Sequence, residues 1–335
     1  MVIFEKSQGI QMSVLVTGGA GYIGSHTVKL LNEKDYDVIV FDNFSRGHIE
    51  SLPKNVKFEN VDLLDYTKLK KIVPKYDIDA VIHFAALAYV EESVEKPDLY
   101  YTNNVTGSLN LLKVLKENGT KKFVFSSTCS LYGNPEKIPI AENQKENPIN
   151  PYAKTKHIIE IMLKDFDHSF GFMFVSLRYF NAAGADPGGR IGESHDPETH
   201  LIPLVLDTAL GKRDKIIIFG DDYETADGTC VRDYIHVDDL AEAHVKALEY
   251  LSENRRSNII NLGTGKGYSV KEVVDIAKEI TNINFDVEVS RRREGDPAVL
   301  IADNKKAKEV LNWQPKYDLY DIIKSAWGWH KNQKY

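Results

Sequence analysis

The chain has 335 residues, of which 42% are hydrophobic, and this is enough for one large core or two domains without stabilising disulfides. Its 42 basic and 49 acidic residues are spread along the sequence and give a formal net charge of -7, which argues against the basic face of a nucleic-acid-binding protein. It has only two cysteines, no apolar run near the roughly 18 residues of a membrane span and no secretion signal in residues 1–11, which favours a cytoplasmic protein.

Apolar, β-branched segments alternate with amphipathic helical segments, which is the pattern of a parallel sheet wrapped by helices. Periodic structure begins only after Met12, so we expect residues 1–11 to be a tail and Met12 to be a candidate start. The predicted helices are Ile23–Asn32, Pro97–Asn118 and Pro151–Phe166. The predicted strands are Ser13–Thr17, Asp37–Asp42, Val56–Asn60, Ala80–Ala85, Lys122–Ser127 and Phe172–Tyr179.

The composition changes after Tyr179. Residues 181–190 are rich in glycine, alanine and proline, and residues 221–228 form an acidic, turn-rich segment. A further apolar segment, Asn258–Leu262, is predicted to return to the first sheet. We therefore predict a doubly wound parallel α/β fold of Rossmann type, with a dinucleotide-binding domain over 12–180 and 232–262 and a smaller mixed α/β domain over 181–231 and 263–335.

A glycine-rich loop follows the first predicted strand and opens the first predicted helix. Gly18, Gly21 and Gly24 permit a tight turn, close approach of the backbone to a pyrophosphate, and close packing of the helix on the sheet. The start of the helix then offers free N–H groups and its positive dipole end to the phosphates. This arrangement predicts a dinucleotide cofactor.

Two carboxylates follow the next strands. Asp42 closes the second strand, where a carboxylate accepts hydrogen bonds from the adenosine ribose and repels an additional phosphate, so NAD is favoured over NADP. Arg46 is close enough in sequence to weaken that preference. Asp62, after the third strand, is a candidate for the adenine edge, with a solvated turn carboxylate as the alternative.

Three residues form the predicted catalytic set. Tyr152 and Lys156 lie four residues apart on a predicted helix, so their side chains share one face. A free phenol titrates near ~10, and a nearby positive charge is expected to lower the pKa of Tyr152 and suit it to proton transfer. Thr128 follows a buried strand and is predicted to hydrogen-bond a substrate alcohol, while Lys156 holds the phenolate and the nicotinamide ribose together. The set predicts hydride chemistry on an alcohol.

Eight motifs follow one another in a diagnostic order: TGGAGYIGSH at 17–26, DN at 42–43, HFAAL at 83–87, FSST at 125–128, YAKTK at 152–156, RYFNAAG at 178–184, VRDYIHV at 231–237 and RREGDPA at 292–298. In these the chain resembles the extended short-chain dehydrogenase/reductase superfamily and, within it, the UDP-galactose 4-epimerase family. The resemblance covers about Val14 to Trp329. The later motifs are more diagnostic than the glycines, because they belong to the nucleotide-sugar site.

The resemblance implies a tightly held NAD and an isomerase that inverts C4 of a UDP-hexose through a transient 4-keto sugar, with no net redox change. It also implies a homodimer in which the helices over 97–118 and 151–166 pair with their copies. The implied cofactor-binding residues add Tyr22, Ile23, Asn43, Leu63, Phe84, Ala85, Asn103 and Phe180 to those named above. The implied substrate-binding residues, besides Thr128 and Tyr152, are Asn181, Leu201, Phe219, Arg232, Arg293, Asp296 and Leu300.

Arginine is the residue type that a pyrophosphate favours, because its planar fork of donors matches the phosphate oxygens. This supports Arg232 and Arg293, whereas the neighbouring Arg291 and Arg292 are expected on a solvated face. In the resembling family a tyrosine at the position of Leu300 restricts the pocket to UDP-glucose and UDP-galactose, so leucine predicts room for the N-acetylated pair.

Some positions depart from the family pattern or carry no predicted role. Thr128 stands where many epimerases have serine, Ala88 where some have a cofactor-binding lysine, and His200 where some have asparagine, which puts a sugar or phosphate contact in doubt. His83 and His236 are expected to be core or turn histidines. With no clustered His/Cys set, the sequence gives no support to a metal site.

Other activities within the superfamily fit less well. A 4,6-dehydratase carries Asp-Glu directly after the threonine, and Cys129-Ser130 stand there instead. Decarboxylating relatives need a glutamate near the same position, and a 4-reductase needs an exchangeable cofactor, commonly NADPH, which Asp42 disfavours. An NAD-sensing regulator with a dead site typically loses the tyrosine or the lysine, and both are present here.

Overall fold

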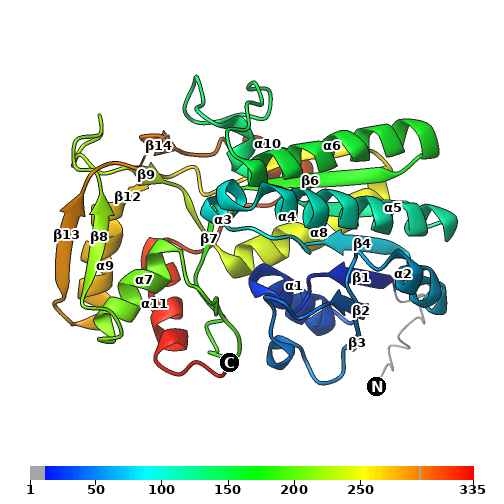
Figure 1. Ribbon diagram of the computed structural model, residues 1–335, viewed down its shortest axis with the longest axis horizontal. Coiled ribbons are helices and arrows are strands. Elements are labelled where there is room, and N and C mark those ends of the chain that lie inside the picture. Colours follow the sequence, from blue (N-terminus) through cyan, green and yellow to red (C-terminus); the bar gives the residue numbers. More distant parts are fainter. Residues whose placement is uncertain (1–11, 294–295) are drawn as a thin grey trace, which may run out of the picture.

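The computed structural model describes residues 12–293 and 296–335, so the expectations for residues 1–11 lie outside the described residues. Its centre is a seven-stranded parallel sheet with the order β11-β6-β5-β4-β1-β2-β3 (Figure 1). The predicted doubly wound α/β fold is confirmed, and the predicted strands are present with ends that differ by at most two residues. They are β1 (Ser13–Thr17), β2 (Asp37–Asp42), β3 (Lys57–Asn60), β4 (Ala80–His83), β5 (Lys122–Ser126), β6 (Met173–Tyr179) and β11 (Asn258–Leu262).

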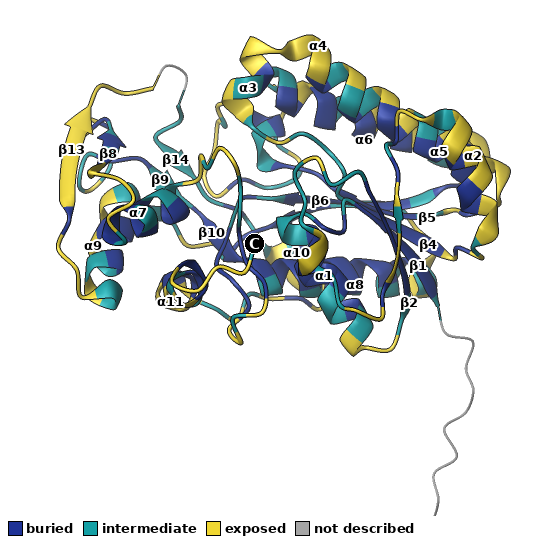
Figure 2. Cartoon of the chain, turned by 60° about the horizontal axis from the view of Figure 1, so that its bottom comes forward, coloured by how far each residue is buried: buried dark blue, intermediate teal, exposed yellow. Residues whose placement is uncertain are grey.

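Side chains alternate along these strands into two cores, one on each face of the sheet. Val14 and Val16 join the core under α1 (Tyr22–Glu33) and α8 (Val237–Asn254), whereas Leu15 joins the opposite core. That second core lies under α2 (Tyr66–Ile72), α5 (Gly107–Glu117) and α6 (Pro151–Phe170). Because both faces are covered, the central strands are buried and the helices expose only their outer sides (Figure 2).

The rest of the chain builds a smaller α/β part beside the sheet (Figure 1). Its third core is shared by α7, α9 and α11. Its short strands pair β7 with β10, β8 with β13, and β9 with both β12 and β14. The division of the chain into two domains with the bounds given above remains a prediction. The elements of this part are β7 (Asn181–Ala183), α7 (Leu201–Ala209), β8 (Lys215–Phe219), β9 (Val231–Arg232), β10 (Tyr234–His236), β12 (Tyr268–Ser269), α9 (Val270–Thr281), β13 (Asp286–Ser290), β14 (Val299–Leu300) and α11 (Leu319–His330). Helix α10 (Lys305–Leu311) returns to the large sheet, where it packs on α8 and β11.

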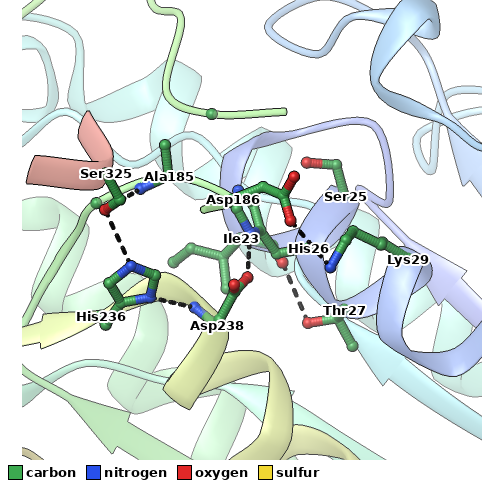
Figure 3. A network of polar contacts seen from close by, with 12 residues as sticks. Ile23, Ser25, His26, Thr27, Lys29, Ala185, Asp186, His236, Asp238 and Ser325 are labelled. Carbon is green, nitrogen blue, oxygen red and sulfur yellow. Dashed lines mark hydrogen bonds and ion pairs between the residues drawn. The ribbon is translucent and has the colours of Figure 1, made fainter. Parts of the chain in front are cut away.

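A polar network fixes the smaller part against α1 (Figure 3). His236 accepts a hydrogen bond from the backbone N–H of Asp238 at 3.0 Å, and its Nε2 lies 3.1 Å from the hydroxyl of Ser325 in α11. The carboxylate of Asp238 lies 2.6 Å from Nδ1 of His26 in α1. As predicted, His236 is a buried turn histidine, and burial lowers its pKa to about 4. None of the described helices is both long and apolar enough to cross a bilayer.

The predicted helix over Pro97–Asn118 is divided. It consists of α4 (Pro97–Tyr100), a π-helical stretch η3 (Tyr101–Thr106) and α5. The structure adds α3 (Val90–Glu95) and the 3₁₀ turns η1 (Ile49–Ser51), η2 (Val73–Lys75) and η4 (Cys129–Tyr132), which the sequence pattern did not predict. These are short pieces, and a periodicity argument needs about two turns of helix to register. No range was predicted for the longer helices α8, α9 and α11 either, and this reason does not apply to them.

Helix α6, which carries the predicted catalytic pair, has strong start and stop signals. Asn150 is its N-cap, and Oδ1 of Asn150 accepts a hydrogen bond from the backbone N–H of Ala153 at 2.9 Å. Pro151 occupies the first helical position, where its missing N–H is not needed. Gly171 ends the helix in the left-handed region at φ +68°, one turn beyond the predicted end at Phe166.

Asn150 caps the helix that carries Tyr152, so the loss of its capping hydrogen bond should measurably reduce the stability of the protein. We expect Asn150→Ala to lower the free energy of unfolding by about 1 kcal/mol, the usual effect of losing a side-chain cap. Denaturant unfolding of the full chain measures this. Asn150→Asp, which keeps a capping oxygen, is the control and should remain close to the wild type; equal stability of all three proteins would contradict the assignment.

Candidate active site

The glycine-rich loop lies between β1 and α1, as predicted. Gly18 adopts φ +69°, and a Cβ at this position would lie 2.5 Å from the backbone nitrogen of Ala85. A Cβ at Gly24 would lie 2.1 Å from the carbonyl oxygen of Gly18. At Gly21, the N-cap of α1, a Cβ would meet only that same oxygen, at 3.4 Å. The loop backbone is therefore in close contact with its neighbours at Gly18 and Gly24. At Gly21, where the helix starts, none of the described side chains covers it.

The first turn of α1 has the donors that a pyrophosphate needs. The backbone N–H groups of Tyr22, Ile23 and Gly24 make no hydrogen bond with any other residue that the structure describes, and no side chain caps the helix. The Tyr22 hydroxyl is directed elsewhere and donates to the carbonyl of Gly184 at 2.6 Å. Free N–H groups at the positive end of a helix dipole bind anions, so the loop fits a dinucleotide.

The adenosine end of the predicted site lies at the ends of β2 and β3. Asp42 accepts hydrogen bonds from the backbone N–H groups of Ala20 at 3.0 Å and Phe44 at 2.8 Å, and burial raises its pKa. The Asn43 amide donates to the carboxylate of Asp62 at 3.0 Å, so these predicted residues are brought together.

Arg46 weakened the predicted preference for NAD over NADP, because it is close to Asp42 in the sequence. In the structure its guanidinium contacts other partners. Its guanidinium lies 3.2 Å from the carboxylate of Glu92 and donates to the carbonyl of Asp196 at 3.1 Å. A guanidinium held by these contacts is less free to bind the additional phosphate of NADP. This agrees with the predicted preference for NAD.

The other predicted cofactor residues follow the strand ends. The backbone N–H groups of Phe84 and Ala85 both donate to the carbonyl of Thr17, at 2.9 and 3.1 Å. Strand β4 therefore ends at His83 rather than at the predicted Ala85. Leu63 is buried after β3, Asn103 lies in η3, and Phe180 packs directly after β6 in a buried cluster with Cys129 and Leu300.

The catalytic set is assembled where β5 ends against the first two turns of α6. The Nζ atom of Lys156 donates to the carbonyl of Ser126 at 2.7 Å and lies 6.0 Å from the centre of the Tyr152 ring. Tyr152, Lys156 and Thr128 are all buried, and burial lowers the pKa of Lys156 to about 7. The structure thus brings the three predicted side chains to one place.

The expected lowering of the Tyr152 pKa is wrong for the ligand-free chain. Burial of the phenol raises its pKa far above the ordinary value, the nearby Tyr179 raises it further, and a hydrogen bond from Thr128 lowers it only in part. The reason is that the sequence argument counted the ammonium of Lys156 but not the burial, which penalises both charged forms.

A buried carboxylate behind this set was not predicted. Glu160 is 0% exposed and lies one further turn along the same face of α6. The Ser127 hydroxyl donates to Oε1 of Glu160 at 2.6 Å, and Nε of Arg178 in β6 donates to the same oxygen at 3.0 Å. Its charge raises the pKa of Lys156 against the effect of burial. The spacing of Tyr152, Lys156 and Glu160 in steps of four was visible in the sequence and could have indicated it.

The predicted substrate residues fall into two contacting groups. Arg232 in β9 pairs with the carboxylate of Asp296 and, in the parallel register of β9 and β14, lies beside Leu300. The Asn181 amide donates to the carbonyl of Asp233, next to Arg232, at 3.2 Å.

In the second group, the Arg293 guanidinium lies over the ring of Phe219 at 4.1 Å. Leu201 is not joined to either group by these contacts; it begins α7 and packs on the third core. Arg292, expected on a solvated face, is half-exposed but lies over the ring of Tyr223 at 4.2 Å.

His83 is a buried core histidine, as expected. Its Nδ1 lies 2.6 Å from the hydroxyl of Thr17 and its Nε2 lies 2.8 Å from the hydroxyl of Ser108. Burial lowers its pKa to about 3, so this ring stays neutral at physiological pH.

Comparison with known proteins places this geometry in a family. Residues 14–263 match the NAD dependent epimerase/dehydratase family. The chain belongs to this family. It is 52% identical over 321 residues to a UDP-glucose 4-epimerase of Halalkalibacterium halodurans. The aligned region covers 96% of each of the two chains.

Two solved structures of the same family superimpose over nearly the whole chain. One is a UDP-glucose 4-epimerase from Bifidobacterium longum in complex with NAD+ and UDP, with 38% identity, a TM-score of 0.92, and coverage of 96% of this chain and 99% of that one. The other is the UDP-Glc/GlcNAc 4-epimerase of Campylobacter jejuni, with 43% identity, a TM-score of 0.85, and the same coverage of 96% and 99%.

The position of Glu160 behind the family's tyrosine–lysine pair leads to a prediction. Glu160→Gln removes the negative charge nearest to Lys156, so the Lys156 pKa should fall and its ammonium should be lost at a lower pH. Breaking a buried ion pair typically costs 3–5 kcal/mol, so the melting temperature should fall as well. We expect the basic limb of the pH–rate profile to move to lower pH.

The matched control is Glu146→Gln. Glu146 also pairs with Arg178, but it is partly exposed and makes no contact with Ser127. It should reduce stability without moving the pH profile. A profile that is unchanged in Glu160→Gln, or that shifts equally in both variants, would assign Glu160 a purely structural role.

Proposed function

We propose that this chain is a UDP-glucose 4-epimerase that interconverts UDP-glucose and UDP-galactose through a transient 4-keto sugar. The observation that carries the proposal is the buried group of Tyr152, Lys156 and Thr128 beside a glycine loop with free N–H donors. Membership of the NAD dependent epimerase/dehydratase family supports it. The dehydratase alternative needs an acid and a base after Thr128, but Cys129 stands there and burial raises its pKa to about 12.

NAD, when bound, would accept hydride from C4 of the sugar and return it to the opposite face. The residues that would hold it are the glycine loop and the first turn of α1 at the pyrophosphate, Asp42 and Asn43 at the adenosine ribose, and Asp62 at the adenine. Phe180 would line the nicotinamide together with the strand-end residues Phe84 and Ala85. Lys156 would reach the nicotinamide ribose.

Tyr152 would move the proton of the 4-hydroxyl, while the Thr128 hydroxyl orients that oxygen. A buried phenol with a raised pKa holds its proton firmly, so on its own it is a weak acid. It becomes a base only when positive charge approaches it. Lys156, fixed on the Ser126 carbonyl, is the protein group positioned to supply that charge.

The nucleotide would be held by the smaller part of the protein. Arg232 and Arg293 would contact the pyrophosphate, and Asp296 would accept the uridine ribose hydroxyls. Asp296 already pairs with Arg232, and this contact would orient the guanidinium toward the ligand. Asn181, Leu201 and Phe219 would complete the UDP-sugar contacts.

We also propose the two-domain division over 12–180 with 232–262 and 181–231 with 263–335, a homodimer and a cytoplasmic location. Large apolar side chains at Leu99, Leu109 and Ile161 are exposed on α4, α5 and α6. These are the helices expected to pair with their copies, and two free cysteines suit a reducing compartment.

The purified protein should interconvert UDP-glucose and UDP-galactose without added NAD, because the cofactor is used and regenerated within each turnover. Chromatographic separation of the two UDP-sugars, with absorbance monitoring of NADH, measures this. Stoichiometric NADH accumulation, or a 4-keto-6-deoxy product, would contradict the proposal.

Tyr152→Phe supplies the internal control for this assay. It should retain the fold and the bound NAD but lose turnover by roughly 10²–10⁴, the scale for losing a positioned acid/base. Near-normal turnover would remove Tyr152 from the role of base.

Leu300 generates a second expectation, on substrate breadth. It lies beside Arg232 and packs with Phe180, so it is positioned between the nucleotide and nicotinamide ends of the site. A rigid pocket rejects an oversized group by steric clash, and leucine is smaller than the tyrosine that restricts related pockets. We expect the wild type to interconvert UDP-N-acetylglucosamine and UDP-N-acetylgalactosamine.

Leu300→Tyr should abolish the N-acetyl activity while sparing the glucose pair, and Leu300→Met, of similar volume, is the matched control. Competition assays with each sugar separate binding from turnover. If neither N-acetylated sugar is turned over or inhibits the wild type, Leu300 does not control the pocket.

A further inference from the structure

The loop between β7 and α7 gathers four side chains that sequence analysis did not group. Glu193, His195, Glu198 and His200 have the spacing E-x-H-x-x-E-x-H, and one ligand atom from each lies within 4.8 Å of the others. Glu193 is buried, the side chains of His195 and Glu198 are 16% and 12% exposed, and that of His200 is half-exposed. The four donors therefore converge just below the surface.

The backbone of this loop is held by contacts that do not involve the four side chains. Nε1 of Trp329 donates to the carbonyl of Glu193 at 2.8 Å, and Nε2 of His48 lies 3.0 Å from the carbonyl of Ser194. The Ser194 hydroxyl donates to the carbonyl of Tyr335 at 3.0 Å. A donor set supported in this way from outside is already positioned for a ligand.

The donor atoms are oriented toward one another. Nδ1 of His195 is buried without a hydrogen bond, 3.2 Å from Oε1 of Glu193 and 3.7 Å from Oε2 of Glu198. The other oxygen of Glu198 accepts from the backbone N–H groups of Thr199 and His200, at 2.7 and 2.8 Å, which leaves Oε2 free. Nδ1 of His200 lies 2.6 Å from Oε1 of Glu193.

We propose that Glu193, His195, Glu198 and His200 form a binding site for a zinc-class divalent metal ion. Zinc binds imidazole nitrogen and carboxylate oxygen at about 2.0–2.2 Å in tetrahedral sites, which separates neighbouring ligand atoms by about 3.4 Å. The distances from Nδ1 of His195 to the two carboxylates already match, whereas the short Glu193–His200 pair must open. Imidazole ligands disfavour magnesium and calcium, which take oxygen donors.

Four protein ligands make a closed, structural site rather than a catalytic one. The ion would join the loop to the start of α7 at Leu201, and it takes no part in the proposed hydride chemistry. In the alternative arrangement the two carboxylates simply pair with the imidazoles, and no metal binds.

The test uses untagged, full-length protein stripped with a chelator and then titrated with Zn²⁺ in a calorimeter and with Co²⁺ in a spectrophotometer. We expect saturable uptake of one Zn²⁺ per chain and the strong visible bands of four-coordinate Co²⁺. Mg²⁺ and Ca²⁺ should give no uptake at the same concentrations. Zn²⁺ should also raise the melting temperature, because it binds the folded state.

Two variants localise the site. His200→Asn changes the most exposed ligand, so folding should be preserved, and Glu198→Gln removes a charge without changing shape; each should weaken Zn²⁺ binding at least tenfold. His168→Ala removes an exposed histidine of α6 and should leave binding unchanged. Absence of one-to-one uptake by the wild type, or uptake that both ligand variants retain, would overturn the proposal.

Discussion

The buried carboxylate of Glu160 is the interaction on which the geometry of the active site depends. It receives the Ser127 hydroxyl and the Arg178 guanidinium at once, so it joins β5, β6 and α6 at one point. The neighbouring residues of β5 continue the same connection, because the carbonyl of Ser126 accepts from Lys156. Removing one member of such a set leaves an uncompensated buried charge. The side chains that we propose as catalytic are therefore positioned by the core of the large sheet rather than by a surface loop.

The same burial sets the electrostatics of the site. It raises the pKa of Tyr152 and lowers that of Lys156 to about 7, so burial penalises the charged form of each side chain. Each unit of pKa shift corresponds to about 1.4 kcal/mol, and an opposite charge within about 4–6 Å can reverse such shifts. A site of this kind is poised to respond to the charge of what binds in it, and Glu160 limits how far the Lys156 pKa falls.

Sequence patterns predicted the parts of the molecule in which neighbouring residues bury a common face. The strands of the large sheet follow from apolar runs, and helix α6 follows from its amphipathic pattern, although its end was predicted at Phe166 and lies at Phe170. What could not be predicted depends on contacts between distant residues. Arg232 and Asp296 are 64 positions apart, and strands of two residues such as β14 carry no periodicity. Periodicity also gave no sign of the π-helical stretch within 97–118, because it continues the helical pattern.

The distribution of polar and apolar contacts in the candidate site suits an enzyme that must present both faces of a sugar. Arg232, Asp296 and Arg293 are charged groups that can make directional contacts, and we propose that they hold the nucleotide in one orientation. Phe180 and Leu300 form an apolar cluster beside them, with Leu300 next to Arg232. Apolar contact is non-directional, so a 4-keto sugar can turn there without breaking a set of hydrogen bonds. Inversion at C4 then requires that the nucleotide anchor and the apolar wall stay fixed relative to each other. Strands β7 and β10 are joined to α1 through the polar network of His236 and Asp238, and β9 directly precedes β10 in the chain, so the smaller part is tied to the large sheet at this point.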